Sequence, residues 1–159
     1  MEKKLNFDFD SLAQEANELA NKNGFWDDTR YFKKIANSFA ECNMADKTEE
    51  INVKIDNLVC VTKLALVTTE ISEAVEAIRK NKRANLSLFN AIRNKEDGTI
   101  QNFMKIFEEH VKDTFEDELA DAIIRIMDLA AEKKINLTEH IALKHTYNKL
   151  RPYKHNVNF

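Results

Sequence analysis

The sequence predicts an all-α fold, and two observations support this class. The 159 residues include only two glycines and one proline, the residue types that most often interrupt helices. Apolar residues recur every three or four positions along most of the chain. A composition of 43% hydrophobic and 32% charged residues is typical of a folded globular protein. We therefore expect one all-α domain spanning residues 1–159.

The first predicted helix has recognisable signals at both ends. Asp8 or Asp10 is suited to cap its N-terminus, because short acidic side chains accept hydrogen bonds from the first free amides. Leucine and alanine residues keep helical spacing as far as about Asn23. Gly24 follows at the position where a left-handed residue commonly ends a helix.

The same criteria predict the rest of the secondary structure. The longer predicted helices cover residues 31–43, 52–81, 100–111, about 114–134 and about 138–149. A short helical turn is expected at residues 86–92, and connections are expected at 25–28 and 46–50. Asp97-Gly98 favours a turn. Arg151-Pro152 should end the last helix, because a residue before proline avoids helical geometry.

Charge and cysteine content exclude several classes of protein. The formal net charge of −3 gives no basic surface for nucleic acid and no polybasic patch for a membrane. The N-terminus lacks an apolar signal core, and no apolar run is long enough to cross a bilayer. Cys42 and Cys60 have no metal-ligand spacing and are expected to be reduced thiols. These features indicate a cytoplasmic protein.

Glu70 lies inside an apolar stripe of the helix predicted for residues 52–81. On a helical wheel its neighbours on both sides are apolar, namely Val59, Leu66, Val67, Ala74 and Ala77. Glu73 falls at the edge of the stripe. A carboxylate in a core-facing stripe is costly unless another group pairs with it. The pattern therefore predicts a partner for Glu70 inside the fold.

Two pairs of acids have the spacing of a metal site. Glu70 and Glu73 are three residues apart, as are Glu118 and Asp121, so each pair shares one face of a helix. Four converging carboxylates would repel one another unless a cation lay among them. Ligands that are all oxygen favour a hard divalent ion such as Mg²⁺ or Mn²⁺.

A simpler interpretation of the second pair is a solvated helix face. Asp121 lies near Arg125 and Asp128 on its wheel, which together form a polar strip. Other metal and phosphate sites find no support in the sequence. No histidine follows a glutamate at the spacing used by helical di-iron proteins, no Cys/His spacing suggests zinc, and no glycine-rich phosphate loop is present.

The motifs Glu70-Ile-Ser-Glu73 and Glu118-Leu-Ala-Asp121, in this order, resemble those of a known family. This is the MazG-like branch of the all-α nucleoside triphosphate pyrophosphohydrolases, a superfamily with dimeric dUTPases and phosphoribosyl-ATP pyrophosphohydrolase. The resemblance extends to residues 24–28, 66–79, 115–130 and 144–155. The resemblance implies a single MazG-like domain, an antiparallel helical bundle. Relative to the family pattern, residues 31–50 and 82–113 look like insertions that carry extra short helices.

The resemblance implies hydrolysis of a nucleoside triphosphate to the monophosphate and pyrophosphate, in nucleotide-pool house-cleaning. It implies Mg²⁺, or Mn²⁺, held by Glu70, Glu73, Glu118 and Asp121, which are also the expected catalytic residues. One of the four acids is expected to act as general base, and Glu73 is the favoured one. A homodimer or homotetramer is also implied.

Further residues are candidates for binding the substrate. They are Lys144, Asn148, Arg151, Lys154, Trp26 and Tyr147. The three cations suit phosphate oxygens. The asparagine is suited either to bond a base or sugar or to cap the last helix, and each aromatic ring either to stack on a base or to anchor the core.

Two alternatives remain at this level. One is an enzyme of the same superfamily with another substrate, either dUTP or phosphoribosyl-ATP. The other is a non-catalytic helical interaction module whose acids form a solvated face. A substrate panel tests the first alternative. A module should gain no thermal stability from Mg²⁺ or Mn²⁺, whereas a four-carboxylate site should. In an enzyme, Glu70→Gln should abolish turnover. From the sequence alone, it should also stabilise the metal-free protein by relieving repulsion.

Overall fold

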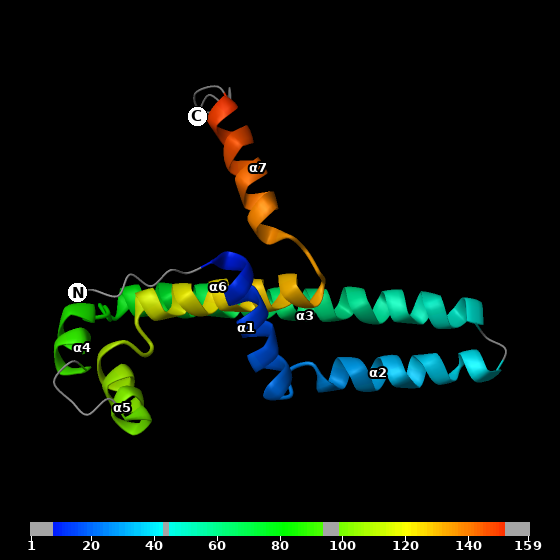
Figure 1. The fold of residues 1–159 in the computed structure, drawn as a ribbon, viewed down its shortest axis with the longest axis horizontal. Coiled ribbons are helices and arrows are strands. Elements are labelled where there is room, and N and C mark those ends of the chain that lie inside the picture. The colour runs from blue at the N-terminus through cyan, green and yellow to red at the C-terminus, as the bar shows by residue number, and fades with distance from the viewer. Residues whose placement is uncertain (1–7, 43–44, 94–98, 152–159) are drawn as a thin grey trace. The chain divides into compact units, whose positions relative to one another are not determined.

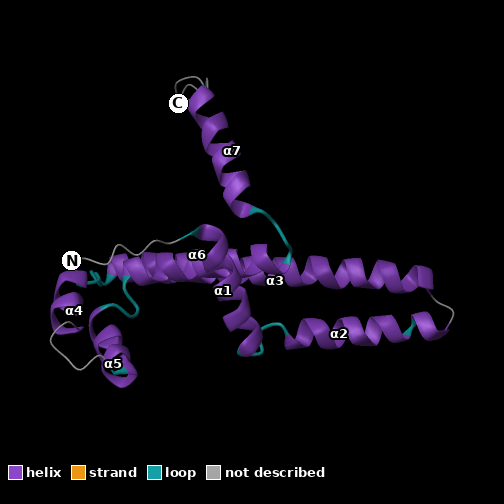
Figure 2. Cartoon of the chain, viewed as in Figure 1, coloured by secondary structure: helices purple, strands orange, loops and turns teal. Residues whose placement is uncertain are grey.

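The computed structural model describes residues 8–42, 45–93 and 99–151, and it confirms the predicted all-α class (Figure 1; Figure 2). These ranges contain helices and turns but no strand. In chain order the elements are α1 (Phe9–Lys22), α2 (Asp27–Ser38), the 3-10 helix η1 (Ala40–Cys42), α3 (Ala45–Arg79), α4 (Leu86–Arg93), α5 (Ile100–His110), α6 (Phe115–Glu132) and α7 (Leu137–Leu150). None of these helices is long and apolar enough to cross a membrane.

The chain divides into two compact units. The larger unit holds α2, η1, α3, α4, α5 and α6 as far as Ile126. The smaller unit holds α1, the end of α6 from Met127, and α7. Both predicted acid pairs lie in the larger unit.

Several predicted helix ends are confirmed. Asp8 caps α1, because its carboxylate accepts the Ser11 amide at 3.3 Å. Gly24 has a φ of 80°, the left-handed geometry that a glycine adopts without strain. The last helix ends before Arg151, which is extended with a ψ of 140°, as expected ahead of a proline. The predicted turn at Asp97-Gly98 lies outside the described residues.

The connection predicted at 46–50 is wrong and the one predicted at 25–28 is right only for residues 25 and 26, because the next helix begins earlier in each case. Residues 46–50 belong to α3, where Thr48 is buried and the Lys54 ammonium pairs with the Glu50 carboxylate one turn away. Helix α2 begins at Asp27 and has two acids in its first turn. Acidic side chains near a helix N-terminus offset the positive end of the helix dipole, so both polar stretches favour helix starts.

Helix α2 packs along the N-terminal part of α3 (Figure 1). Lys33 pairs with Asp56 at 2.7 Å, and Asn52 donates to the Asn37 side-chain oxygen at 2.8 Å. Trp26, only 1% exposed, anchors the start of this pair within the core. The hairpin continues into the part of α3 that carries Glu70, so it supports the site from one end.

Helices α4 and α5 form their own small core between α3 and α6 in sequence. Phe89 is buried at its centre, and its ring meets those of Phe103 and Phe107 edge-to-face at 5.7 and 6.3 Å. Such edge-to-face geometry is the favoured aromatic arrangement. The helix predicted at residues 100–111 is confirmed here as α5.

In the smaller unit, α1 contacts both the end of α6 and α7. Asp128, expected on a polar strip with Asp121, is instead buried. Its carboxylate accepts a hydrogen bond from Asn17 at 2.8 Å. Thr138 of α7 donates to Asp10 of α1 at 2.7 Å. Hydrogen bonding to an amide makes burial of the Asp128 carboxylate tolerable.

Candidate metal centre

Three carboxylates converge between α3 and α6. Glu70 and Glu73 come from one turn of α3, and Glu118 comes from the first turn of α6. One oxygen of each lies within 4.8 Å of an oxygen of the other two. Glu70 is 4% exposed and Glu118 is 5% exposed, whereas Glu73 reaches solvent. The predicted burial of Glu70 is therefore confirmed, and Glu118 is not on a solvated face.

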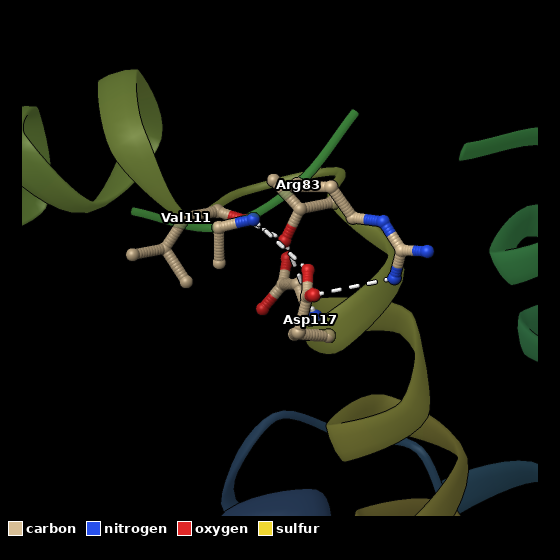
Figure 3. A network of polar contacts seen from close by, with 6 residues as sticks. Arg83, Val111 and Asp117 are labelled. Atoms are coloured by element: carbon tan, nitrogen blue, oxygen red, sulfur yellow. Dashed lines mark hydrogen bonds and ion pairs between the residues drawn. The ribbon is translucent and has the colours of Figure 1, made fainter. Parts of the chain in front are cut away.

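A hydrogen-bond network holds the start of α6 close to the segment that follows α3 (Figure 3). The Glu116 carboxylate accepts the Ala84 amide at 2.9 Å and one Arg83 Nη at 3.4 Å. The Phe115 amide donates to the Lys82 carbonyl at 3.3 Å. Because Glu118 is only two residues beyond Glu116, this network positions its side chain beside Glu70.

The N-terminus of α6 is capped by Thr114, the residue directly before the helix. Its hydroxyl accepts the Asp117 amide at 3.4 Å and donates to the Val111 carbonyl at 2.6 Å (Figure 3). The Asp117 carboxylate in turn accepts the Asp113 amide at 3.0 Å. Asp113 has a φ of 58°, which turns the chain sharply into the helix.

Arg125 is the cation that contacts the cluster. Its Nε lies 2.5 Å from Oε1 of Glu70. The partner of Glu70 in this structure is therefore an arginine one turn beyond Asp121 on α6. This contact revises the expected effect of Glu70→Gln on the metal-free protein, because the substitution removes an attraction as well as a repulsion.

The environment of Glu118 favours its neutral form. Burial is the main cause that raises the pKa of Glu118 to about 7. The negative charge of Glu73 and a hydrogen bond shared with Glu70 act in the same direction. The raised pKa of Glu118 thus reflects burial first, and the proximity of the other two acids second.

Two further acids border the cluster. Partial burial raises the pKa of Asp121, and the charges of Asp117 and Glu70 add to this. Burial likewise raises the pKa of Asp117, although its bond from the Asp113 amide opposes the shift. Asp121 is exposed and lies outside the group of three that converges most closely. The structure thus brings together three of the four predicted ligands and places the fourth nearby on α6.

The donor set fits a hard divalent cation. Around octahedral Mg²⁺, with oxygens at about 2.1 Å, neighbouring ligand oxygens lie about 3 Å apart and opposite ones about 4 Å apart. Oxygens already within 4.8 Å of one another need only small side-chain rotations to reach these distances. All the donors are carboxylates, which suit Mg²⁺ or Mn²⁺ better than zinc. Glu70, Glu73 and Glu118 would hold such an ion, with Asp121 as a possible fourth ligand.

A pocket of about 170 Å³ opens beside the acids. It is lined by Glu73, Glu76, Ala77, Lys80, Lys82, Asp113 and Glu118. Its lining therefore combines four carboxylates with two lysines. Lys80 is paired with Glu76 at 3.1 Å. Such a mixed lining suits a ligand that brings both a cation and anionic groups.

The predicted substrate-binding residues lie in different places. Trp26 is buried in the larger unit, where the Lys63 ammonium lies 4.0 Å from the centre of its ring, so it is a core anchor. Lys144, Tyr147, Asn148 and Arg151 belong to the smaller unit, on α7 or directly after it. They are exposed. Lys154 lies outside the described residues.

On α7, two cations flank one aromatic ring. The Lys144 ammonium lies 5.1 Å and the Arg151 guanidinium carbon 5.9 Å from the ring centre of Tyr147. At these distances both cations can interact with the face of the same ring. Asn148 accepts the Arg151 amide with its backbone carbonyl.

Sequence reasoning overlooked three residues around the site. Arg125 was assigned to a polar strip, yet Glu118, Asp121 and Arg125 follow the i, i+3, i+7 spacing that places residues on one helix face. That spacing was the available signal. No sequence signal identified Asp117 and Lys82 as neighbours of the site. Their positions depend on how the chain turns before α6.

Comparison of the chain with protein-family models, with curated proteins and with solved structures gives no match. The family resemblance therefore rests on the sequence segments described above, and most of all on the two acidic motifs.

Proposed function

We propose that this chain is a MazG-like, Mg²⁺-dependent nucleoside triphosphate pyrophosphohydrolase. It would convert a (d)NTP and water to the (d)NMP and pyrophosphate, in the cytoplasm, as nucleotide-pool house-cleaning. The observation that carries the proposal is the convergence of Glu70, Glu73 and Glu118 from two helices, with two of these carboxylates buried. An acidic solvated face of an interaction module has no need to bury carboxylates against one another.

The residues of the cluster divide by exposure. Glu70 and Glu118 are enclosed and would hold a Mg²⁺ or Mn²⁺ ion from the protein side. Bound there, the ion offsets phosphate charge and lowers the pKa of a coordinated water. Glu73 reaches solvent and lines the pocket, so it is placed to take a proton from an attacking water as general base. Asp121 would supply a fourth carboxylate, the second from α6.

The phosphate chain needs cations that the acids do not supply. Lys80 and Lys82 line the same pocket as Glu73 and Glu118, which places them within reach of a polyphosphate there. On α7, Lys144 and Arg151 form a second basic group around Tyr147. The resemblance of residues 144–155 to the family's C-terminal segment supports these residues, Asn148 and Lys154 as further candidates for nucleotide contact.

We also propose that the protein is a homodimer or homotetramer. Leu58, Val61 and Leu64 of α3 are all more than half exposed. They lie within about a third of the helix circumference, because residues three apart differ by roughly 60° around an α-helix. A continuous apolar helix face of this kind is typical of protein–protein contacts.

Pyrophosphate release tests the enzyme class. Purified protein would be assayed with a panel of canonical and modified (d)NTPs, dUTP and phosphoribosyl-ATP, with and without Mg²⁺. We expect Mg²⁺-dependent release that disappears in Glu70→Gln and persists in Glu109→Gln, an exposed position on α5. If no nucleotide is cleaved and Mn²⁺ does not raise the melting temperature, the interaction module becomes the better interpretation.

A further inference from the structure

One ion pair in the larger unit differs from the others described there. The Arg125 Nε donates to Glu70 Oε1 at 2.5 Å, and the Glu70 side chain is only 6% exposed. In pairs such as Lys33–Asp56, both side chains are well exposed. An exposed pair contributes little, whereas a buried carboxylate depends strongly on its partner. The contact with Arg125 should therefore stabilise Glu70 more than an exposed ion pair stabilises its carboxylate.

Arg125 supplies a fixed positive charge. A guanidinium group does not lose its proton under conditions that proteins survive, so it offsets a neighbouring carboxylate at every working pH. It also occupies one of the two carboxylate oxygens of Glu70 at close range. A divalent cation bound between Glu70, Glu73 and Glu118 needs oxygen from that same carboxylate, and its charge repels the guanidinium.

We propose that Arg125 is a built-in counter-ion of Glu70, which competes with a divalent cation for this carboxylate and thereby sets the cation affinity of the site. The inference rests on the proposed function only in requiring that the three acids bind a divalent cation. Arg125 acts on the cation through Glu70, so it is a positioning residue and not a ligand.

The surroundings of Arg125 allow it to exchange partners. Its side chain is 40% exposed, so the end of the guanidinium reaches water while Nε contacts Glu70. Asp121 lies one turn earlier on the same face of α6 and offers a second carboxylate. An arginine released towards solvent beside a metal site is also well suited to contact a phosphate oxygen.

The test compares Arg125→Gln with Arg30→Gln, a control that removes an arginine from the exposed pair with Asp27 in the same unit. Melting temperature would be measured without metal and with saturating Mn²⁺, and the Mn²⁺ dissociation constant by electron paramagnetic resonance. For Arg125→Gln we expect a lower melting temperature without metal, and Mn²⁺ binding tighter on the order of tenfold. The deficit in melting temperature should vanish or reverse with Mn²⁺.

A double-mutant cycle separates competition from a general charge effect. In a Glu70→Gln background, Arg125→Gln should change the metal-free melting temperature much less than it does in the wild type. If Arg125→Gln does not fold, Arg125→Lys provides the second variant. Lysine keeps the charge but loses the Nε contact, so its Mn²⁺ affinity should be higher than that of the wild type.

Equal destabilisation with and without Mn²⁺, at an unchanged dissociation constant, would overturn the inference and leave the proposed function standing. Mn²⁺ binding that tightens in Arg125→Gln, in a protein that cleaves no nucleotide, would support the inference and count against the proposed function. A wild-type protein that binds no Mn²⁺ would overturn both.

Discussion

The amide of Ala84 donates to Oε2 of Glu116 at 2.9 Å, which joins the segment after α3 to the first turn of α6. The two residues are 32 positions apart, yet the contact lies close to the carboxylates that the sequence predicted as ligands. Bonding to this backbone amide is the main cause that lowers the pKa of Glu116, so the carboxylate stays charged and the contact persists in mildly acidic solution.

The first prediction concerns this contact. Glu116→Ala removes the acceptor for the Ala84 amide and the partner of Arg83. Glu118 should then be held less well, so Mn²⁺ binding should weaken, by no more than about tenfold because Glu116 itself is not a ligand. Isothermal titration with Mn²⁺ measures the effect, and Glu109→Ala on α5 is the matched control. Unchanged affinity in Glu116→Ala would show that the network does not position Glu118.

The second prediction is a dependence of stability on pH. Burial raises the pKa of Glu118 from 4.5 to about 7, so the native state keeps a proton that the unfolded state releases at lower pH. The free energy of unfolding of the metal-free protein should therefore fall as pH rises from about 4.5 to about 7, by no more than about 3 kcal/mol. Urea titrations across this range measure it.

Two changes should remove most of that dependence. Glu118→Gln has no proton to lose, and saturating Mn²⁺ stabilises the ionised carboxylate. A slope that is the same in wild type and Glu118→Gln would assign the titration to other groups.

The third prediction concerns Glu70→Gln. Because Glu70 carries the ion pair with Arg125, the substitution should abolish Mg²⁺-dependent pyrophosphate release without raising the metal-free melting temperature. This differs from the expectation based on repulsion among acids alone. Calorimetry on the metal-free protein decides between the two, since a clear rise in melting temperature would mean that repulsion outweighs the pairing with Arg125.

The fourth prediction concerns the smaller unit. Asn17 donates to the buried Asp128 carboxylate, so Asn17→Ala leaves a charged group short of a donor. We expect a loss of about 1–3 kcal/mol in the free energy of unfolding. Asn17→Asp should cost more, because it places a second carboxylate against the first. Chemical denaturation of both variants checks the order, and an Asn17→Asp protein more stable than Asn17→Ala would contradict it.

The fifth prediction tests assembly. Leu58 is 68% exposed on the apolar face of α3, so Leu58→Glu should cost the isolated chain little stability. If this face joins copies of the chain, the substitution should lower the mass measured by light scattering coupled to size exclusion. Glu49→Lys, at an exposed position opposite Leu58 around the same helix, is a charge-changing control. A wild-type protein that is already monomeric would contradict the proposed oligomer.

Helix existence was predictable from sequence to a large extent, because scarcity of Gly and Pro and regular apolar spacing are local properties. The capping by Asp8 and the stop before Pro152 are local for the same reason. The helix starts at Asp27 and Ala45 were missed, since polar residues were taken as loop although acids favour a helix N-terminus.

The site was predictable only in part. Spacing identified Glu70, Glu73 and Glu118, because i, i+3 pairing follows from helix geometry alone. The contact between Glu70 and Arg125 joins residues 55 positions apart, and its existence depends on how α6 lies against α3. The wheel of α6 places Arg125 on the same face as Glu118 and Asp121, but it does not identify Glu70 of another helix as the partner of Arg125.

The hydrogen bond between the Phe115 amide and the Lys82 carbonyl also bears on how this protein tolerates change in length. It brings the two ends of the stretch containing α4 and α5 together, so the chain leaves the acidic helices and returns at nearly the same point. A stretch with adjoining ends can be shortened, extended or exchanged for a tight turn with little strain on what it connects. Replacing it is therefore a practical way to graft new recognition elements beside the carboxylates.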